Sequence, residues 1–75
     1  MEMTLDRLCL GQKAVVTRID TAAHLRMRLR DFGLVPGTEV RCRYHSPGGS
    51  VTALELRGSV LALRTGDLGR IWGCC

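Results

Sequence analysis

The chain has 75 residues, of which 45% are hydrophobic and only 4% are aromatic. Its length predicts one small domain, and its hydrophobic content excludes an intrinsically disordered chain. No apolar run approaches the roughly 20 residues of a membrane-spanning helix, so we expect no direct insertion into a membrane.

Ten arginines and one lysine outweigh seven acidic residues and give a net charge of +4. Because the guanidinium group binds carboxylates and phosphates well, this charge is compatible with an acidic protein, a nucleic acid or an anionic membrane surface as partner. The first residues include acids and contain no apolar signal core, so we expect a cytoplasmic protein. In that compartment the four cysteines would be reduced thiols.

The N-terminal residues predict a short apolar segment that ends at Gly11. Its leucines are Leu5, Leu8 and Leu10. Residues 13–19 (KAVVTRI) are rich in β-branched side chains, which favour a strand. Asp20 and Thr21 follow with side chains that can cap the N-terminus of a helix.

Residues 22–32 follow a helical period, with one apolar stripe and an arginine-rich flank. The stripe consists of Ala22, Leu25, Leu29 and Phe32. The residues outside it include Arg26, Met27, Arg28 and Arg30. Gly33 stands where a glycine in the left-handed conformation ends a helix. Pro36 and Gly37 then predict a turn, with proline at its preferred second position.

Residues 38–45 (TEVRCRYH) alternate between the two faces of a predicted strand. The side chains expected to face the core are Val40, Cys42 and Tyr44. The opposite face carries Glu39, Arg41, Arg43 and His45. Residues 51–56 and 59–64 predict a hairpin closed by Arg57–Gly58, and residues 69–72 predict a short last strand after a turn.

The connections that follow the helix are too short for parallel crossovers, so the strands should be antiparallel. Short antiparallel strands hide their edges best when they close into a small barrel. We therefore predict a mainly β fold, with residues 1–75 forming a single domain. Its architecture would be an SH3-like barrel of about five strands, with one α-helix between the first and second strands.

The sequence contains no phosphate-binding glycine loop, no acid pair placed for catalysis and no nucleophile with a recognisable partner base. We therefore predict a protein that is not an enzyme and that needs no cofactor. His24 and His45 lie at predicted solvent-facing positions and have no second ligand at metal-binding spacing. A surface role is favoured for both.

Cys74 and Cys75 form a pair of soft ligands that could make a metal or redox site. Adjacent cysteines lack the CxxC spacing of established metal sites, so we favour a frayed chain end without such a role. A regulatory divalent metal stays an open alternative. Cys9 and Cys42 lie in apolar patterns and are expected in the core.

The candidate partner surface covers the helix, the turn at residues 33–37 and the adjacent strand face. Its proposed contact residues are Arg26, Met27, Arg30, Arg41 and Arg43. Each arginine alone is expected to be solvated, but together they can form a docking face for an acidic protein. Nucleic-acid binding is not expected, because basic RNA sites usually carry stacking aromatic residues and this chain has few. Gly33, Pro36 and Gly37 are assigned to backbone geometry.

The segments RLRDFGLVPGTEV and SPGGSVTALELRGSVLALRTGDLGRI resemble FeoA proteins, the small cytosolic accessories of bacterial ferrous iron transport. The resemblance extends from Leu5 to Ile71. It implies an SH3-like barrel with helical additions that acts as an accessory or regulatory binding module. Its implied partner is FeoB, a large membrane transporter with a cytosolic G-protein domain. The ending WGCC departs from the family, and no shared set of metal ligands can be carried over.

Two alternatives stay open at this point. The same barrel occurs as the C-terminal domain of iron-dependent repressors, which would make the chain a metal-dependent regulatory module. An RNA- or ribosome-associated SH3-like barrel is the other alternative that the charge permits. Weak self-association is also left open.

Overall fold

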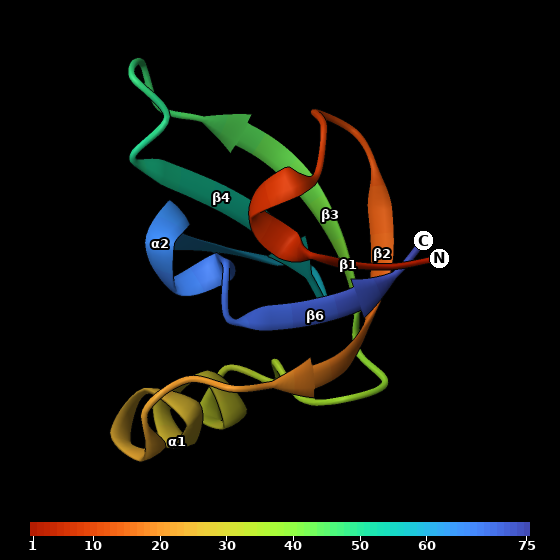
Figure 1. The fold of residues 1–75 in the computed structure, drawn as a ribbon, viewed down its shortest axis with the longest axis vertical. Coiled ribbons are helices and arrows are strands. Elements are labelled where there is room, and N and C mark those ends of the chain that lie inside the picture. Colours follow the sequence, from red (N-terminus) through yellow and green to blue (C-terminus); the bar gives the residue numbers. More distant parts are fainter.

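A computed structural model describes residues 1–75 of the chain (Figure 1). Its elements in chain order are β1 (Glu2–Thr4), the 3-10 turn η1 (Leu5–Arg7), β2 (Lys13–Ile19), α1 (Ala23–Asp31), β3 (Glu39–His45), β4 (Val51–Leu56), β5 (Ser59–Arg64), α2 (Thr65–Leu68) and β6 (Ile71–Cys74). All six strands belong to one sheet in the order β1-β6-β2-β3-β4-β5, and every pairing is antiparallel. The predicted mainly β fold is confirmed, with six strands where about five were expected.

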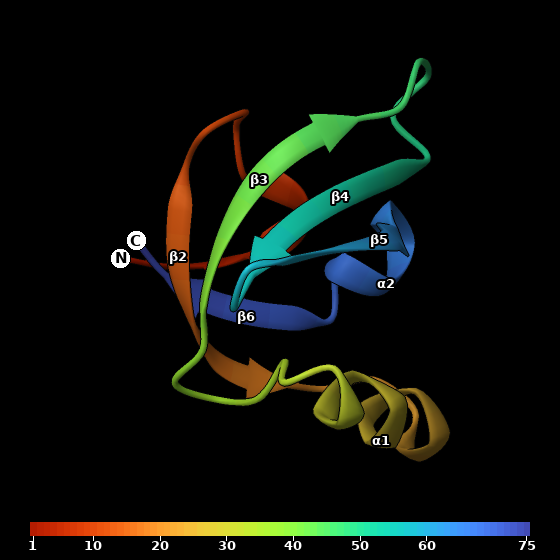
Figure 2. The ribbon, with the colours of Figure 1, turned by 180° about the vertical axis from the view of Figure 1, so that it is seen from behind.

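The sheet curls around one hydrophobic core, and α1 lies below it at one end (Figures 1 and 2). The short elements η1 and α2 contact each other on another side of the curled sheet. The core residues are Leu5, Leu8, Ala14, Val16, Leu29, Leu34, Val40, Cys42, Leu54, Leu56, Leu68 and Ile71. They are almost all aliphatic, as the scarcity of aromatic residues requires.

The local sequence patterns predicted the bounds of the central strands to within one residue. The strands predicted at 13–19, 51–56 and 59–64 have these bounds in the structure, and the one predicted at 38–45 begins one residue later. Arg57 and Gly58 both have positive φ angles, as the tight turn of a two-residue hairpin requires.

Both ends of the chain differ from the prediction. β1 was not expected, and the last strand lies at residues 71–74, because residues 65–68 form the short helix α2 instead of a turn. β6 lies between β1 and β2, with Met3 opposite Gly73. The two ends of the chain therefore lie side by side (Figure 1). Leu10 is exposed, so only part of the N-terminal apolar segment enters the core.

The start and the buried face of α1 also differ from the prediction. The N-cap residue is Ala22, and no side chain caps the helix, so the expected capping by Asp20 or Thr21 is wrong. Leu29 is fully buried, but the side chain of Phe32 is 61% exposed, because the helix ends at Asp31 and Phe32 is already its C-cap. The apolar stripe is thus shorter than its period indicated.

A bulge in β3 reverses the predicted facing of two residues. The pairing register with β4 shifts between Cys42 and Tyr44, which leaves Arg43 as an extra residue. Tyr44 therefore points outward and is 53% exposed, whereas His45 turns inward. The predictions for both residues were wrong. Cys42 is fully buried, as expected, but Cys9 is exposed.

Candidate functional site

The end of α1 is fixed by a Schellman motif. Gly33 has a φ of +89°, and its N–H donates to the carbonyl of Arg30 at 2.9 Å. The N–H of Leu34 donates to the carbonyl of Leu29 at 2.9 Å, and both leucine side chains are buried in the core. These two bonds and the apolar contact define this type of helix end. The φ of Gly33 lies in the left-handed region, which glycine adopts without steric cost.

The chain then turns through Pro36 and Gly37 back into β3. The N–H of Thr38 donates to the carbonyl of Val35 at 3.0 Å, and Gly37 has a φ of +96°, which together indicate a type II turn. The buried Thr38 hydroxyl donates to the carbonyl of Gly33 at 2.7 Å. The N–H of Gly37 also donates to Val16 in β2 at 2.7 Å. Residues 33–38 are therefore held in one conformation against the barrel.

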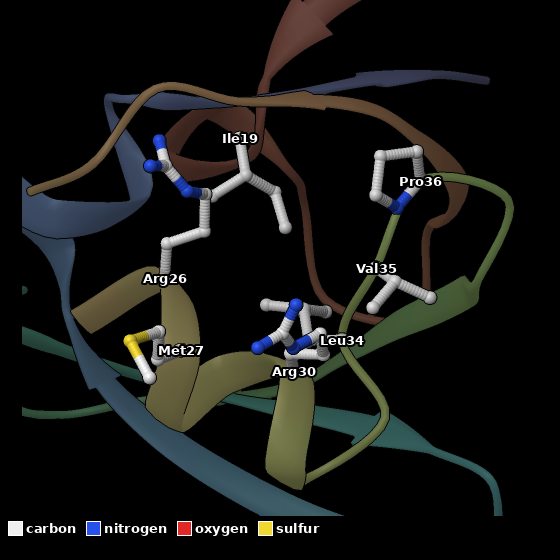
Figure 3. Close-up of a pocket in the computed structure, with 7 residues that line it drawn as sticks. All are labelled: Ile19, Arg26, Met27, Arg30, Leu34, Val35 and Pro36. Atoms are coloured by element: carbon white, nitrogen blue, oxygen red, sulfur yellow. The ribbon is translucent and has the colours of Figure 1, made fainter. Parts of the chain in front are cut away.

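A groove of about 200 Å³ lies between this turn and α1. The residues that line it are Ile19, Arg26, Met27, Arg30, Leu34, Val35 and Pro36. Figure 3 shows the three α1 side chains on one side of the groove and Val35 and Pro36 on the other. Leu34 is fully buried at the groove, while Met27 is 57% exposed. The groove is therefore apolar inside and carries arginines at its rim.

The two groove arginines have no acidic partner. The one ion pair in the structure joins Arg43 to Glu55 at 3.4 Å, and neither the Arg26 nor the Arg30 side chain makes a hydrogen bond. Arg26 and Arg30 are i, i+4 neighbours on α1, an arrangement of like charges that costs a helix about 0.2–0.5 kcal/mol. A carboxylate bound between them would relieve this repulsion.

The structure divides the predicted partner surface into two parts. Arg26, Met27 and Arg30 meet at the groove. Arg41 lines a separate cleft with acidic and basic neighbours, and Arg43 is engaged with Glu55. The turn at residues 33–37, which was expected on this surface, supplies Leu34, Val35 and Pro36 to the groove. Ile19 of β2 was not predicted as part of a site. It is apolar and lies at the end of a predicted strand, which is the only sequence signal that marks it.

The cysteines and histidines do not converge into a cluster of metal ligands. No group of three or more His, Cys, Asp or Glu side chains is placed to hold a metal ion. Burial raises the pKa of the Cys42 thiol above its ordinary value of 9.0, so this thiol is protonated at neutral pH and unreactive. His24 is exposed on α1. Cys74 belongs to β6, so at least this residue is not part of a frayed end.

His45 serves a structural purpose inside the barrel. Its Nε2 lies 3.1 Å from the carbonyl oxygen of Leu8, and its Nδ1 lies 3.0 Å from the hydroxyl of Thr52. Because a carbonyl oxygen only accepts, Nε2 donates to Leu8, and in the neutral ring Nδ1 then accepts from the Thr52 hydroxyl. Nε2 also lies 3.4 Å from the sulfur of Cys42. The ring thus ties the N-terminal segment to β3 and β4.

Neither α1 nor α2 has the length and the apolar character of a membrane-spanning helix. The curled sheet, the covering helix and the lined groove define a small SH3-like barrel with a candidate docking site on its surface. The family model that describes the FeoA domain matches residues 3–73. The chain belongs to the FeoA family.

Solved structures agree with this assignment. The FeoA-like protein from Clostridium acetobutylicum is 30% identical with a TM-score of 0.83, over 96% of this chain and 84% of that one. FeoA from Stenotrophomonas maltophilia, determined with zinc and described as a procaryotic SH3 domain protein, is 36% identical with a TM-score of 0.76, over 92% of this chain and 86% of that one.

The same fold also occurs in a repressor. The repressor IdeR from T. acidophilum is 19% identical with a TM-score of 0.80, over 97% of this chain and 33% of that one, which shows a shared fold alone. No curated protein matches the sequence.

Proposed function

We propose that this chain is a non-enzymatic accessory module of bacterial ferrous iron uptake that works in the cytoplasm. Its partner would be the cytosolic region of an FeoB-type membrane transporter. Membership of the FeoA family supports the link to ferrous iron transport. The groove beside α1 is the observation that carries the docking proposal, because it combines an apolar interior with unpaired cations at the rim.

The groove favours one kind of partner segment. A volume of about 200 Å³ accommodates one or two aliphatic side chains and not a folded domain. Arg26 and Arg30 would hold carboxylates on either side of such a side chain, since arginine binds carboxylates in a bidentate manner. The segment would therefore be short, with an apolar residue flanked by Asp or Glu. The rigid turn at residues 33–38 means that little ordering is needed on this side of the interface.

The test measures binding of the purified chain to the isolated cytosolic region of the transporter by calorimetry. The double variant Arg26→Glu/Arg30→Glu should weaken binding by about tenfold or more, equal to about 1.4 kcal/mol or more. Arg7→Glu/Arg64→Glu is the matched control, because it changes the net charge equally at two exposed arginines outside the groove. This control should bind within about twofold of the wild type.

Three results would overturn the proposal. Equal loss in the groove variant and in the control would mean that only the net charge matters. No association of the wild type with the transporter region, together with binding to RNA, would favour the ribosome-associated alternative. The variant Arg41→Glu/Arg43→Glu tests the second part of the predicted surface, and a loss confined to it would move the docking site to β3.

A further inference from the structure

The backbone of β5 has no hydrogen-bonding partner on one of its two sides. β5 is the last strand in the sheet order and pairs with β4 alone. Its neighbours along the chain are the hairpin turn at one end and the short α2 at the other (Figure 2). β4 and α2 are the elements that β5 packs against. The side of β5 that faces away from β4 is therefore an open sheet edge.

The pairing register shows which backbone groups lie on this side. The first residue of β5, Ser59, follows a two-residue turn with positive φ angles and so exchanges hydrogen bonds with β4. Antiparallel pairs alternate between bonded and non-bonded positions. In the same phase, the N–H of Thr65 donates to the residue before β4 at 2.9 Å. The N–H groups of Val60, Ala62 and Arg64 therefore point away from β4, and we call this side of the strand the β5 edge.

The β5 edge lacks the usual protection of a strand edge. Natural sheets shield their edges with very short strands, prolines, bulges or charged side chains. The opposite edge strand, β1, has only three residues. β5 has six, its register with β4 has no bulge, and residues 59–63 (SVLAL) contain neither proline nor charge. Val60 is 62% exposed and Ala62 is exposed beside it. Such an edge can accept an added strand through its main-chain groups.

The side chains around the β5 edge indicate the chemistry of that added strand. Leu61 and Leu63 are partly buried and pack against the core, so side chains beside them on the inner face should be apolar. Arg57 in the turn and Arg64 at the far end are exposed, and neither forms an ion pair. They flank a strand about 20 Å long. An added strand with an acidic residue near each end would pair with both arginines.

A second copy of the chain fits this edge less well. In a fully overlapping antiparallel pair of two β5 strands, the turn of one copy lies near the end of the other. Arg57 of each copy would then approach Arg64 of the other at both ends of the pair. Like charges placed across a sheet destabilise it. The charge therefore favours an acidic segment of a different protein.

We propose that the β5 edge binds an extended segment of another protein by strand addition. The segment has apolar residues at alternate positions and an acidic residue near each end. Its backbone pairs with the outward groups of Val60, Ala62 and Arg64. The site is separate from the groove beside α1, because no groove residue belongs to β5. Its test does not depend on the transporter.

The test titrates the ¹⁵N-labelled chain with the blocked peptide Glu-Thr-Val-Thr-Val-Glu and follows the amide signals by nuclear magnetic resonance. Shifts should concentrate in residues 59–64, and hydrogen exchange of the outward amides should slow. Ala62→Pro removes one outward donor at an edge position where proline is tolerated, and it should weaken binding by about tenfold or more. Ala62→Val keeps this donor and should bind within about twofold of the wild type.

Charge variants test the ends of the segment. Arg57→Gln/Arg64→Gln should weaken peptide binding by about fivefold, as expected for the loss of two exposed ion pairs. Arg7→Gln/Arg26→Gln is the matched control, since it removes the same charge at two exposed arginines outside β5 and its turn. This control should bind like the wild type.

Two N-methylated peptides test the backbone contact on the unchanged protein. Methyl groups on the odd-numbered and on the even-numbered peptide amides block opposite edges of the added strand. One peptide should therefore bind like the unmodified probe, and the other should not bind.

Four results would overturn the proposal. The first is equal binding of both methylated peptides, and the second is a set of shifts centred on residues 24–37. The third is no saturable binding at about 1 mM peptide. The fourth is a dimer of the chain alone in which the outward amides of Val60 and Ala62 are protected, because the occupant would then be a second copy.

Discussion

Cys42 is buried in the core and lies 3.4 Å from the ring of His45, the partly buried last residue of β3. The bulge at Arg43 creates this contact, because it turns His45 inward next to a cysteine that also faces the core. A sequence pattern with strict alternation assigns these two residues to opposite faces. One extra residue in a strand leaves no mark in composition or spacing, so local sequence reasoning cannot place either His45 or Tyr44 correctly.

The buried Cys42 thiol makes stability depend on pH in the alkaline range. Burial raises its pKa in the folded chain above 9.0, so the unfolded chain loses this proton at a lower pH than the folded chain does. Between the two pKa values the unfolded state binds fewer protons, and the free energy of unfolding falls as the pH rises. Below the pKa of the unfolded thiol this contribution is fully present.

The measurement is urea unfolding of the reduced protein from pH 7 to pH 10. Above about pH 9 the free energy of unfolding should fall more steeply for the wild type than for Cys42→Ala. The variant is less stable at every pH because it leaves a cavity, but it lacks the thiol whose titration causes the pH dependence. Cys74→Ala, at an exposed thiol that does not act on the Cys42 pKa, should keep the wild-type slope. Identical slopes for the wild type and Cys42→Ala would contradict the account.

At the scale of elements, the junction between α1 and β3 determines the shape of the groove. Gly33 is the critical position, because its φ of +89° belongs to the left-handed region and a Cβ atom there would lie 3.0 Å from Cδ of Arg57. Both effects oppose a side chain. Leu34, Val35 and Pro36 follow directly, so a change at Gly33 displaces one wall of the groove.

Gly33→Ala should therefore lower the free energy of unfolding by about 1–2 kcal/mol, the cost of a left-handed non-glycine residue. Gly66→Ala is the matched control, since Gly66 lies in α2 with open space around its Cα and an ordinary φ angle. It should be neutral or stabilising by up to about 1 kcal/mol. Thermal or urea unfolding measures both, and an unchanged stability of Gly33→Ala would show that the helix end tolerates another conformation.

Elements with a strong local signal were predicted well, and elements that depend on distant partners were not. The β-branched run of β2 and the glycine that ends α1 both act through neighbouring residues. β1 has three residues and is stabilised only by pairing with β6 at the other end of the chain. The start of α1 was predicted wrongly although its local signal was strong. Asp20 and Thr21 can both cap a helix, but the structure uses neither side chain for this purpose.

At the scale of the molecule, the barrel separates three features on its surface. The groove lies beside α1, and the mixed-charge cleft lies along β3. At a third edge the two chain ends pair, and the Cys75 Sγ atom contacts the Met3 Sδ atom. The sequence placed the helix residues and the turn at residues 33–37 on one surface. Ile19 joins them only in three dimensions, because β2 and the turn are hydrogen-bonded to each other through Val16.

The central claim is that the groove beside α1 is the docking surface of the protein. Nuclear magnetic resonance of the ¹⁵N-labelled chain, titrated with the unlabelled cytosolic region of an FeoB-type transporter, tests it most directly. The account predicts amide shifts or line broadening concentrated in residues 24–37 and at Ile19, with β3 and β4 little changed. Shifts centred on Arg41 and Arg43, or no shifts at a saturating concentration of the transporter region, would contradict it.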